Sequence, residues 1–395
     1  MDLVRIGVPR MNYSLVLLLS GLIITGFIRG TLPGNATEGQ VVEVEVLFTI
    51  GLTESDLLGR PVDVATDSKG RIYIVDQVGP AIRVYSKRGD SLGTIGRRGR
   101  GPGELQRPTT LYMSPDDRLF VGDHGGMRVT EYRTEGEYKQ VWSRGRVGDQ
   151  WVPPSNLEQL NDSTFIFEGL MRDVSGRVRP DERLHVIRLK EDAMSVIDSF
   201  FSPRHLWGEL SPQYEHLIGL RGGSLLLGRD HRVLYAPYPY DGEIFVFHGS
   251  PSWHLQDRWE GYVETEAPYE KIHPDAISEG DSSSFQVTRM KSGEPETVAG
   301  IIHNTTLGLY QLQDGRIVHF TQVRQKGARK FGVEVYRADG TFEGYSLLPG
   351  VAEVGFGRTP VVAWKDSQDR FYVITTGGEK DVPVVRVISL KIGGP

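Results

Sequence analysis

The feature that most constrains the fold of this chain is a meander of short strands and turns that returns along its length. The clearest copy runs from Pro61 to Leu105, where four short apolar runs are separated by turns that contain Asp, Gly or Pro. Short apolar runs bounded by such turns are typical of antiparallel β-strands. One meander cannot bury its inner face alone, so further copies must follow for it to pack against.

The recurring part of the meander is the turn into its second strand together with that strand. Six copies occur along the chain, at Arg71–Val75, Asp117–Val121, Ser163–Phe167, His231–Tyr235, Gly315–His319 and Asp369–Val373. The first intervals between copies match the roughly 40 to 50 residues of a propeller blade, and the longer later intervals indicate insertions. The sequence therefore predicts an all-β fold, a six-bladed β-propeller of four-stranded antiparallel blades.

The first copy resembles the NHL-type β-propeller repeat, and within that group the six-bladed propellers of bacterial exported proteins. The residues that carry the resemblance are Gly70–Asp76, Ile82–Tyr85 and the crossover Gly96–Leu105, with Pro108 opening the next blade. The match is close for two blades and loose afterwards. Because many members of that family have no known activity, the resemblance implies a fold more than a function.

The last copy of the meander lacks a strand that the N-terminal part of the chain can supply. Pro360–Ile392 contains only three apolar runs, whereas Val41–Ile50 alternates Val with Glu, the period of a strand with one solvated face. We expect Val42–Phe48 to be the fourth strand of the last blade and so to close the ring, which removes free strand edges. The alternative is an extra edge strand on the first blade.

The N-terminal segment has the pattern of an export signal. Arg5 and Arg10 precede the apolar run Leu15–Ile28, which is shorter than the roughly 20 residues of a membrane-spanning helix. Small residues at Gly34–Ala36 provide a cleavage site, whereas Arg29 favours an uncleaved anchor, and a buried core helix is the remaining alternative. We expect residues 1–36 to be a signal peptide or N-terminal membrane anchor, and residues 37–395 to be an exported propeller, periplasmic or extracellular.

Composition excludes several classes of function. The chain has no cysteine, which rules out disulfides, thiolate metal sites and thiol catalysis. Its 45 Lys and Arg residues against 51 Asp and Glu leave a net charge of −6, which argues against nucleic-acid binding. We expect a monomer that meets the membrane only through its N-terminal segment and binds a protein or small-molecule ligand of unknown identity.

The long loops of the predicted propeller gather on one face. In an up-and-down blade, the loops after strands two and four leave one side of the disc, and those after strands one and three leave the other. Nearly all the long ones belong to the first group: Gly96–Arg107, Ser143–Asn156, Gly169–Arg183, Phe201–Gly223, Gly261–Thr305 (the one segment in which helix is expected, around Pro268–Ser278), Gln322–Phe331 and Thr375–Pro383. Long loops over a rigid scaffold commonly carry binding sites, so we expect this loop-rich face to be functional.

Two loops of this face are rich in glycine and arginine. Their arginines are Arg97, Arg98 and Arg100 in the first loop, and Arg144 and Arg146 in the second. Guanidinium groups bind carboxylates, phosphates and sulfates through paired hydrogen bonds, and glycines allow sharp backbone turns. These arginines are therefore candidate ligand-binding residues; the alternative is that they are solvated side chains on a structural crossover.

Two acidic residues end the second strands of the first two blades on the same face. These are Asp76 and Asp123, and His124 follows directly. Carboxylates on adjacent blades can bind a cation or act as acid and base, but each can instead cap its own turn by accepting backbone hydrogen bonds. The ten histidines show no close ligand spacing, so a divalent cation in the channel, the one cofactor left open, would need ligands from different blades.

Tyr238 and Tyr240 are the aromatic candidates for a binding role on the loop-rich face. Their rings can stack on a sugar or a peptide side chain, and the alternative is packing between blades. Gly89–Gly93 matches the G-x-S-x-G motif around Ser91, but it lacks the strand–turn–helix context that the motif needs. The sequence therefore predicts no catalytic residue.

These observations favour a binding scaffold for a ligand or protein partner on the loop-rich face, with no identifiable chemistry. The competing hypothesis is a hydrolase or lyase with a divalent metal in the central channel, as some related propellers are. Fold does not decide between the two. Three or more His, Asp or Glu side chains converging at the channel mouth would distinguish the enzyme.

Overall fold

The structure is a computed structural model that describes residues 42–144, 150–151, 155–169, 171–172, 178–179, 183–202, 222–249, 252–263, 269–273, 275, 284–291, 294–325, 328–351, 361–377 and 382–393. Internal contacts divide the chain between Asn35 and Ala36, and only the second unit contains described residues. The predicted export segment Leu15–Ile28 therefore lies outside them. Within the described ranges, no helix has both the length and the apolar character needed to cross a bilayer.

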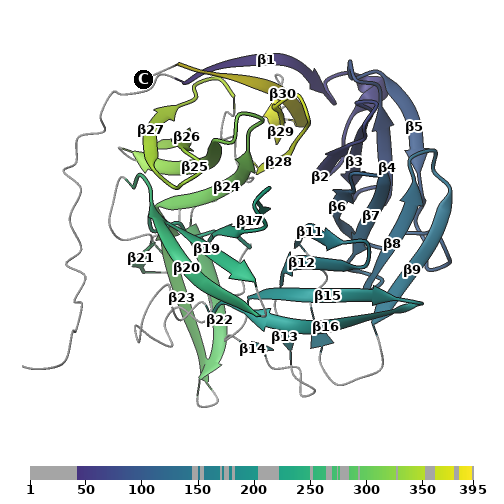
Figure 1. The fold of residues 1–395 in the computed structure, drawn as a ribbon, viewed down its shortest axis with the longest axis horizontal. Coiled ribbons are helices and arrows are strands. Elements are labelled where there is room, and N and C mark those ends of the chain that lie inside the picture. The colour runs from purple at the N-terminus through teal and green to yellow at the C-terminus, as the bar shows by residue number, and fades with distance from the viewer. Residues whose placement is uncertain are drawn as a thin grey trace, which may run out of the picture. The chain divides into compact units, whose positions relative to one another are not determined.

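The described strands form six antiparallel blades (Figure 1). Blade 1 consists of β2 (Pro61–Thr66), β3 (Ile72–Asp76), β4 (Ala81–Tyr85) and β5 (Ser91–Ile95). Blade 2 consists of β6 (Pro108–Met113), β7 (Arg118–Asp123), β8 (Arg128–Arg133) and β9 (Tyr138–Arg144). Blade 3 consists of β11 (Ser155–Asn161), β12 (Thr164–Glu168), β15 (Leu184–Lys190) and β16 (Ala193–Phe200).

The second half of the ring follows the same plan. Blade 4 consists of β17 (Ser224–Leu227), β18 (Val233–Ala236), β19 (Glu243–Gly249) and β20 (Trp253–Glu260). Blade 5 consists of β24 (Asn304–Gln311), β25 (Ile317–Gln325), β26 (Ala328–Tyr336) and β27 (Phe342–Leu347). Blade 6 consists of β28 (Val361–Lys365), β29 (Arg370–Gly377), β30 (Val382–Ile392) and the N-terminal strand β1 (Val42–Ile50).

The N-terminal strand closes the ring, as predicted. β1 pairs antiparallel with β30, from Val42 opposite Ile392 to Ile50 opposite Val385. The first strands of successive blades contact one another in the order β2, β6, β11, β17, β24, β28, and β28 contacts β2 again. Six four-stranded blades thus surround one channel, and the last blade is joined from both ends of the propeller, which leaves no unpaired edge at the seam.

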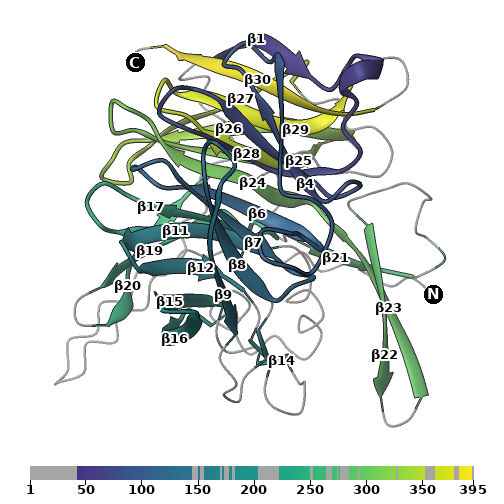
Figure 2. The same cartoon turned by 90° about the vertical axis from the view of Figure 1, so that its right-hand side faces the viewer.

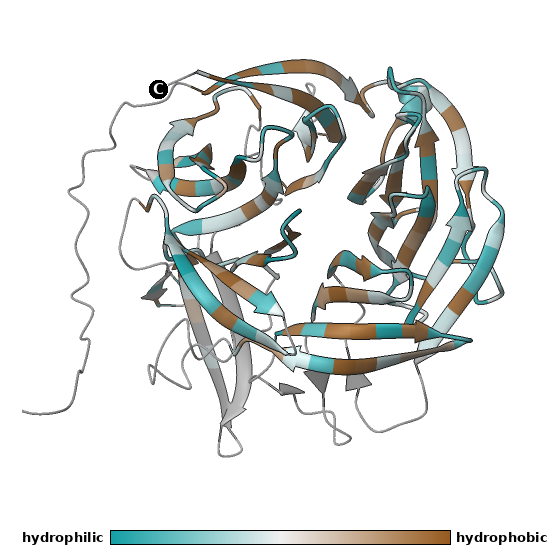
Figure 3. Ribbon diagram, viewed as in Figure 1, coloured by the Kyte–Doolittle hydropathy of each residue, from teal (hydrophilic) through white to brown (hydrophobic). Residues whose placement is uncertain are grey.

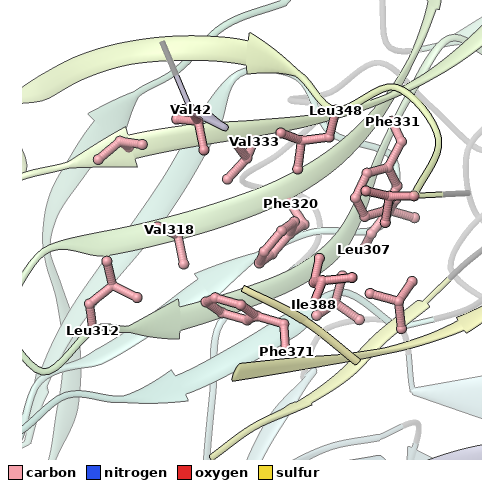
Figure 4. Close-up of a cluster of buried hydrophobic side chains, with 14 residues drawn as sticks. Val42, Leu307, Leu312, Val318, Phe320, Phe331, Val333, Leu348, Phe371 and Ile388 are labelled. Carbon is pink, nitrogen blue, oxygen red and sulfur yellow. The ribbon is translucent and has the colours of Figure 1, made fainter. Parts of the chain in front are cut away.

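The core lies between the blades. Figure 3 shows apolar and hydrophilic bands alternating along the strands. The apolar side chains of one blade pack against those of the next. Between blades 5 and 6, for example, Phe320 and Val333 pack with Phe371 and Ile388 (Figure 4). The rings of Phe320 and Phe371 lie 4.9 Å apart, edge to face. Burying one such side chain stabilises the fold by about 1.5–3 kcal/mol, so the ring is held by many contacts of this kind.

A shared turn positions the second strands of the first and last blades. Asp67 accepts hydrogen bonds from the Arg71 backbone N–H, from Arg71 Nε at 2.6 Å and from the Tyr73 hydroxyl at 3.1 Å. Blade 6 repeats this pattern, with Asp366 accepting from Arg370 and Tyr372. The spacing Asp-x-x-x-Arg-x-Tyr therefore fixes the same turn in both blades.

The insertions form additional small sheets. One contains β10 (Gln150–Trp151), β13 (Met171–Arg172) and β14 (Val178–Arg179), and the other β21 (Tyr269–Ile272), β22 (Ser284–Lys291) and β23 (Glu294–Ile302). β22 and β23 extend away from the blades (Figure 2). The helix expected around Pro268–Ser278 is wrong over residues 269–272, because β23 offers a strand edge that β21 pairs with.

Candidate functional site

A cavity of about 710 Å³ lies at the centre of the ring and is lined by residues of all six first strands. The lining residues include the start of β2 with Asp63, the middle of β11 with Glu158 and the last part of β24 with Tyr310, together with residues that precede the first strands, such as Arg60 and Arg107. The first strands begin where the long loops end, so the cavity occupies the loop-rich end of the channel. Its size suits a small molecule, since ligand pockets commonly measure roughly 300–1,000 Å³.

Two arginines mark the mouth of the cavity. Arg60 and Arg107 each precede the proline that begins the first strand of its blade, Pro61 or Pro108. Both side chains are exposed, and no described residue forms an ion pair or hydrogen bond with either guanidinium group. Their positive charges are therefore free to meet an anion at the mouth.

Asp63 lies deeper in the channel and links blades 1 and 2. Its Oδ2 accepts hydrogen bonds from Thr110 Oγ1 at 2.9 Å and the Leu111 N–H at 2.7 Å, and its Oδ1 accepts one from the Val64 N–H at 2.9 Å. Burial raises the pKa of the Asp63 carboxyl to about 7, and these hydrogen bonds oppose the rise without cancelling it. No described cationic side chain donates to this carboxylate.

Glu158 is the second acidic group in the channel, and no described residue donates a hydrogen bond to it. Its side chain keeps some contact with the water-accessible cavity, but protein surrounds it, and this burial raises the pKa of its carboxyl to about 8. Tyr310 interacts with both channel acids. Burial is the main cause that raises the pKa of its hydroxyl well above the usual range, and the negative charges of Asp63 and Glu158 raise it further. The Tyr310 hydroxyl itself donates to the Val362 carbonyl at 2.6 Å.

The two predicted rim acids have a different environment from the channel acids. Asp76 accepts hydrogen bonds from the N–H groups of Gly59, Arg60 and Val78 at 2.8–3.1 Å and pairs with Arg83. Both oxygens are thus supplied with donors, as the capping alternative requires.

Asp123 repeats this arrangement in blade 2. It accepts from the N–H groups of Gln106 and Arg107 at 3.0 and 2.7 Å and from Arg128 Nε at 3.4 Å. The bonds of Asp76 and Asp123 fix the backbones of Arg60 and Arg107, and so place the two mouth arginines. A direct role of either rim acid in ligand binding stays a prediction.

The arginine-rich part of the first loop, residues 97–100, folds against Glu104 and Leu105 and does not line the cavity. Arg97 Nε lies 2.9 Å from Glu104 Oε1, while Arg98 forms a β-bridge with Leu105. The Arg100 carbonyl accepts a hydrogen bond from Arg128 Nη1. A Cβ at Gly99 would lie 1.9 Å from Glu104 Oε2, so a larger residue there would displace the Glu104 side chain.

The second arginine-rich loop is only partly described. The Arg144 backbone ends β9 and pairs with Met194 of β16, and Arg146 lies outside the described residues. Anion binding by the arginines of either loop stays a prediction.

The remaining candidates fall in three places. Tyr238 lines the cavity. His124 donates its backbone N–H to the Arg107 carbonyl, and burial, followed by the nearby Arg107 charge, lowers the pKa of its imidazole. Tyr240 is buried between blades 4 and 5, as the packing alternative expected, and its hydroxyl donates to Glu334 Oε2 at 2.9 Å.

A fully buried polar chain begins at the cavity wall. Thr306, which lines the cavity, lies 3.0 Å from His319 Nε2, and His319 Nδ1 lies 2.7 Å from Glu334 Oε2. Glu334 also accepts from the hydroxyls of Tyr240 and Tyr336, so the chain joins blade 4 to blade 5. Hydroxyl, imidazole and carboxylate in this order are the groups of acyl-transfer enzymes.

The described residues contain no group of three His, Cys, Asp or Glu side chains placed to hold a metal ion. Asp63 and Glu158 supply two carboxyls to the cavity, whereas Ca²⁺ takes six to eight oxygen ligands. The convergence that would have distinguished a metal-dependent enzyme is therefore not present in this part of the chain.

The four charged residues of the cavity were missed from the sequence because they come from three blades. One signal was available: Arg60–Pro61 and Arg107–Pro108 repeat the same dipeptide at the same position of consecutive blades. Asp63 and Glu158 each stand in a strand with other polar residues and carry no such mark.

Comparison with known proteins agrees with this architecture. A family model, DUF5128, described as a 6-bladed beta-propeller, matches residues 44–144, which contain β1 and blades 1 and 2. Among solved structures, a member of the duf4221 family from Bacteroides vulgatus is similar over 89% of this chain and 99% of its own, with 12% identity and a TM-score of 0.55. No curated protein matches the sequence.

Two enzymes are also similar in outline. A gluconolactonase from Xanthomonas campestris matches with 13% identity over 89% of this chain and 90% of its own, at a TM-score of 0.48. Virginiamycin B lyase from Staphylococcus aureus matches with 10% identity over 89% of this chain and all of its own (100%), at a TM-score of 0.45. Likeness at this level carries no information on activity. The blades and the family description together make this chain a six-bladed β-propeller.

Proposed function

We propose that this chain is an extracytoplasmic binding scaffold that takes a small-molecule ligand into the cavity on its loop-rich face. The observation that supports this most is the cavity itself, because its wall combines leucines and valines with polar side chains such as Asn156 and with four charged side chains, Arg60, Arg107, Asp63 and Glu158. Ligand pockets use placed polar groups to orient a ligand against apolar walls, and this cavity is richer than most in such groups. None of the four charges forms an ion pair with a described residue, so each is available to a ligand.

The remaining features of the proposal come from the sequence. Residues 1–36 would direct export or anchor the protein, and the blades would be of the NHL-repeat type, on the pattern of Gly70–Asp76 and Ile82–Tyr85. The propeller would act as a monomer, since its seam is closed within one chain by β1 and β30.

A thermal-melting screen tests the binding proposal. A panel of amino acids, short peptides, monosaccharides, dicarboxylates and polyamines is added to the wild-type protein, and to a Ser224→Trp variant whose new side chain would fill the cavity. Ser224 is half-buried, lines the cavity and forms no side-chain hydrogen bond with a described residue. A ligand at about 100 times its Kd stabilises the folded state by about 2.7 kcal/mol, which a melting shift detects.

The matched control is Ser91→Trp, which places the same residue on the exposed outer strand of blade 1. We expect panel members that raise the melting temperature of the wild type and of Ser91→Trp but not of Ser224→Trp. Equal shifts in all three proteins, or no shift from any class of compound, would contradict the proposal.

A second candidate function is ester or amide hydrolysis, favoured by the Thr306–His319–Glu334 chain at the cavity wall. The Thr306 oxygen would attack the carbonyl carbon, and His319 would pass the hydroxyl proton to the leaving alcohol or amine as its bond breaks. Water would then hydrolyse the acyl-threonine. Hydrolysis of nitrophenyl esters that is lost in Thr306→Val supports this candidate, and activity unchanged in that variant, or absent from the wild type, excludes it.

A further inference from the structure

We infer that the ligand is a small linear zwitterion, which places an organic cation between Asp63 and Glu158 and a carboxylate between Arg60 and Arg107. This inference rests on the proposed binding function and adds the chemical class of the ligand. It follows from how the four charges are arranged along the channel, because the acids lie inside and the arginines lie at the mouth.

The residues at the inner end of the cavity favour the binding of a cation. Glu158 receives no hydrogen bond from any described residue, and Asp63 receives only uncharged donors. An ionised carboxylate that is removed from water without a partner is costly, and an ammonium or guanidinium group would relieve that cost for both acids. The raised pKa values of these two carboxyls, about 7 and about 8, reflect the same lack of a partner.

Two aromatic side chains line the cavity together with the two acids. Tyr310 lies close enough to both for their charges to raise the pKa of its hydroxyl, and Trp364 of blade 6 also lines the cavity. The Trp364 indole N–H is already donated to Thr66 Oγ1 at 2.9 Å, which fixes the ring. Rings of this kind attract organic cations through their faces, so the inner end suits an amine better than a bare metal ion.

The mouth of the cavity favours an anion that accepts hydrogen bonds from two guanidinium groups. Arg60 and Arg107 occupy equivalent positions of adjacent blades, each with its backbone N–H held by a rim acid, Asp76 or Asp123. Arginine side chains bind carboxylates through paired, charge-assisted hydrogen bonds. Because both guanidinium groups are exposed and unpaired among the described residues, a ligand carboxylate would be their first ionic partner.

The spacing of the charges sets the length of the ligand. Asp63 of β2 lies three positions after Arg60, which directly precedes the strand. Because a strand rises about 3.3 Å per residue, the two backbone positions lie roughly 10 Å apart along the channel. A free amino acid is too short to reach both ends, whereas an extended chain of three amino acids spans about 10 Å. The apolar wall residues Leu157, Leu225 and Leu309 between the ends would accept small apolar side chains.

Three forms of one peptide test this inference by isothermal titration calorimetry with the purified protein. Trialanine carries both charges, N-acetyl-trialanine lacks the cation, and trialanine amide lacks the carboxylate. We expect trialanine to bind, and acetylation to weaken binding about tenfold or more, because it removes the ion pairs at the buried end. Amidation should weaken it by a smaller factor, because the mouth is solvated.

Variants of the cavity residues test which protein side chain binds each charge of the peptide. Glu158→Gln should bind trialanine and N-acetyl-trialanine with nearly equal affinity, and Arg60→Gln together with Arg107→Gln should equalise trialanine and its amide. The matched controls are Glu54→Gln and Arg88→Gln, two exposed residues that do not line the cavity. Both controls should keep the wild-type preferences, and melting curves establish that every variant is folded.

Two results would overturn the inference: trialanine does not bind, or all three peptides bind equally. If another class of compound raises the melting temperature of the wild type but not of Ser224→Trp, the cavity still binds a ligand. Only the inference that this ligand is a zwitterion is then wrong. If no compound depends on Ser224, the binding function fails as well.

Discussion

Two sets of acids at the loop-rich end of this propeller differ in what surrounds them. Glu168, which ends the second strand of blade 3, joins the rim acids Asp76 and Asp123: all three are buried, and each accepts hydrogen bonds from several backbone or side-chain donors, including an arginine. The half-buried channel acids, Asp63 and Glu158, receive neutral donors only, or none, from the described residues. The supply of donors therefore separates the two sets.

The two sets also differ in their expected effect on stability. Donors that replace water offset the cost of burying a rim carboxylate, so its removal leaves buried donors unsatisfied. Nothing comparable compensates Glu158, whose ionised form is a cost to the empty protein. A residue that costs stability is commonly retained for function, and this contrast orders the following predictions.

The largest effect is expected at Glu168, which joins blades 3 and 4. It accepts from Arg183 Nε at 2.8 Å, the Gly223 N–H at 3.0 Å and the Tyr235 hydroxyl at 2.6 Å, and Arg183 is itself buried. Glu168→Gln leaves that arginine without its charge partner and should lower the free energy of unfolding by about 3–5 kcal/mol, measured by urea denaturation. The exposed residue Glu191 provides the control, as Glu191→Gln; a loss at Glu168 no larger than in the control would place it outside the rim set.

A smaller loss is expected at Asp123, whose partners are mainly backbone N–H groups. In Asp123→Asn one carboxylate oxygen becomes an N–H₂ group that faces the N–H of Gln106 or Arg107. The unfolding free energy should fall by about 2 kcal/mol in the same assay. Asp162→Asn changes an exposed aspartate and should have no effect; equal stability of both variants would refute the capping role of Asp123.

The opposite effect on the free energy of unfolding is expected at Glu158, where substitution should stabilise the fold. Because burial raises the pKa of its carboxyl to about 8, the folded state holds a proton that the unfolded state releases at lower pH. Stability should therefore fall as pH rises from about 4.5 towards about 8. Glu158→Gln removes this loss and should be more stable than the wild type by about 1–2 kcal/mol near pH 9, with the water of the cavity reducing the full effect.

Urea denaturation near pH 5.5 and near pH 9 measures this difference. Asp63, with a pKa of about 7, keeps part of the pH dependence in the variant. Destabilisation by Glu158→Gln at both pH values would mean that Glu158 has a partner in the fold and belongs with the rim acids.

The smallest effect is expected at Arg97 of the first arginine-rich loop. Its side chain is 81% exposed and pairs with Glu104 at the surface, away from the cavity lining. Arg97→Gln should change neither stability nor the affinity for trialanine measurably, because exposed ion pairs contribute little. If Arg97→Gln weakens trialanine binding as much as Arg60→Gln does, the anion site extends to the first arginine-rich loop. The assignment of the anion site to Arg60 and Arg107 alone is then wrong.

Much of the fold was predictable because blade structure is local. Turns such as Asp67–Tyr73 fix their strands through contacts within a few residues, so the sequence alone marks them. The closure of the ring was also predictable, since the last copy visibly lacked a strand that Val42–Phe48 could supply. The error at β21 arose because the pairing edge of β23 lies far along the chain from it.

The candidate site was less predictable because it forms only when the ring closes. Tyr238 was identified as a candidate and lines the cavity, whereas Asp63 and Glu158 meet there from blades 1 and 3. Nothing in the local sequence of either acid says whether donors will surround it. That information lies in the neighbouring blades, and it separates these residues from Asp76 and Asp123.

The most direct test of this account is the pKa of Glu158, measured by carbon-13 NMR of the side-chain carboxyls and assigned with the Glu158→Gln variant. We expect a pKa near 8 in the free protein, and a fall towards the ordinary value of about 4.3 when trialanine is added, because an ammonium group stabilises the carboxylate. A pKa near the ordinary value without ligand, or one that trialanine leaves unchanged, would contradict a channel acid that awaits a cationic ligand.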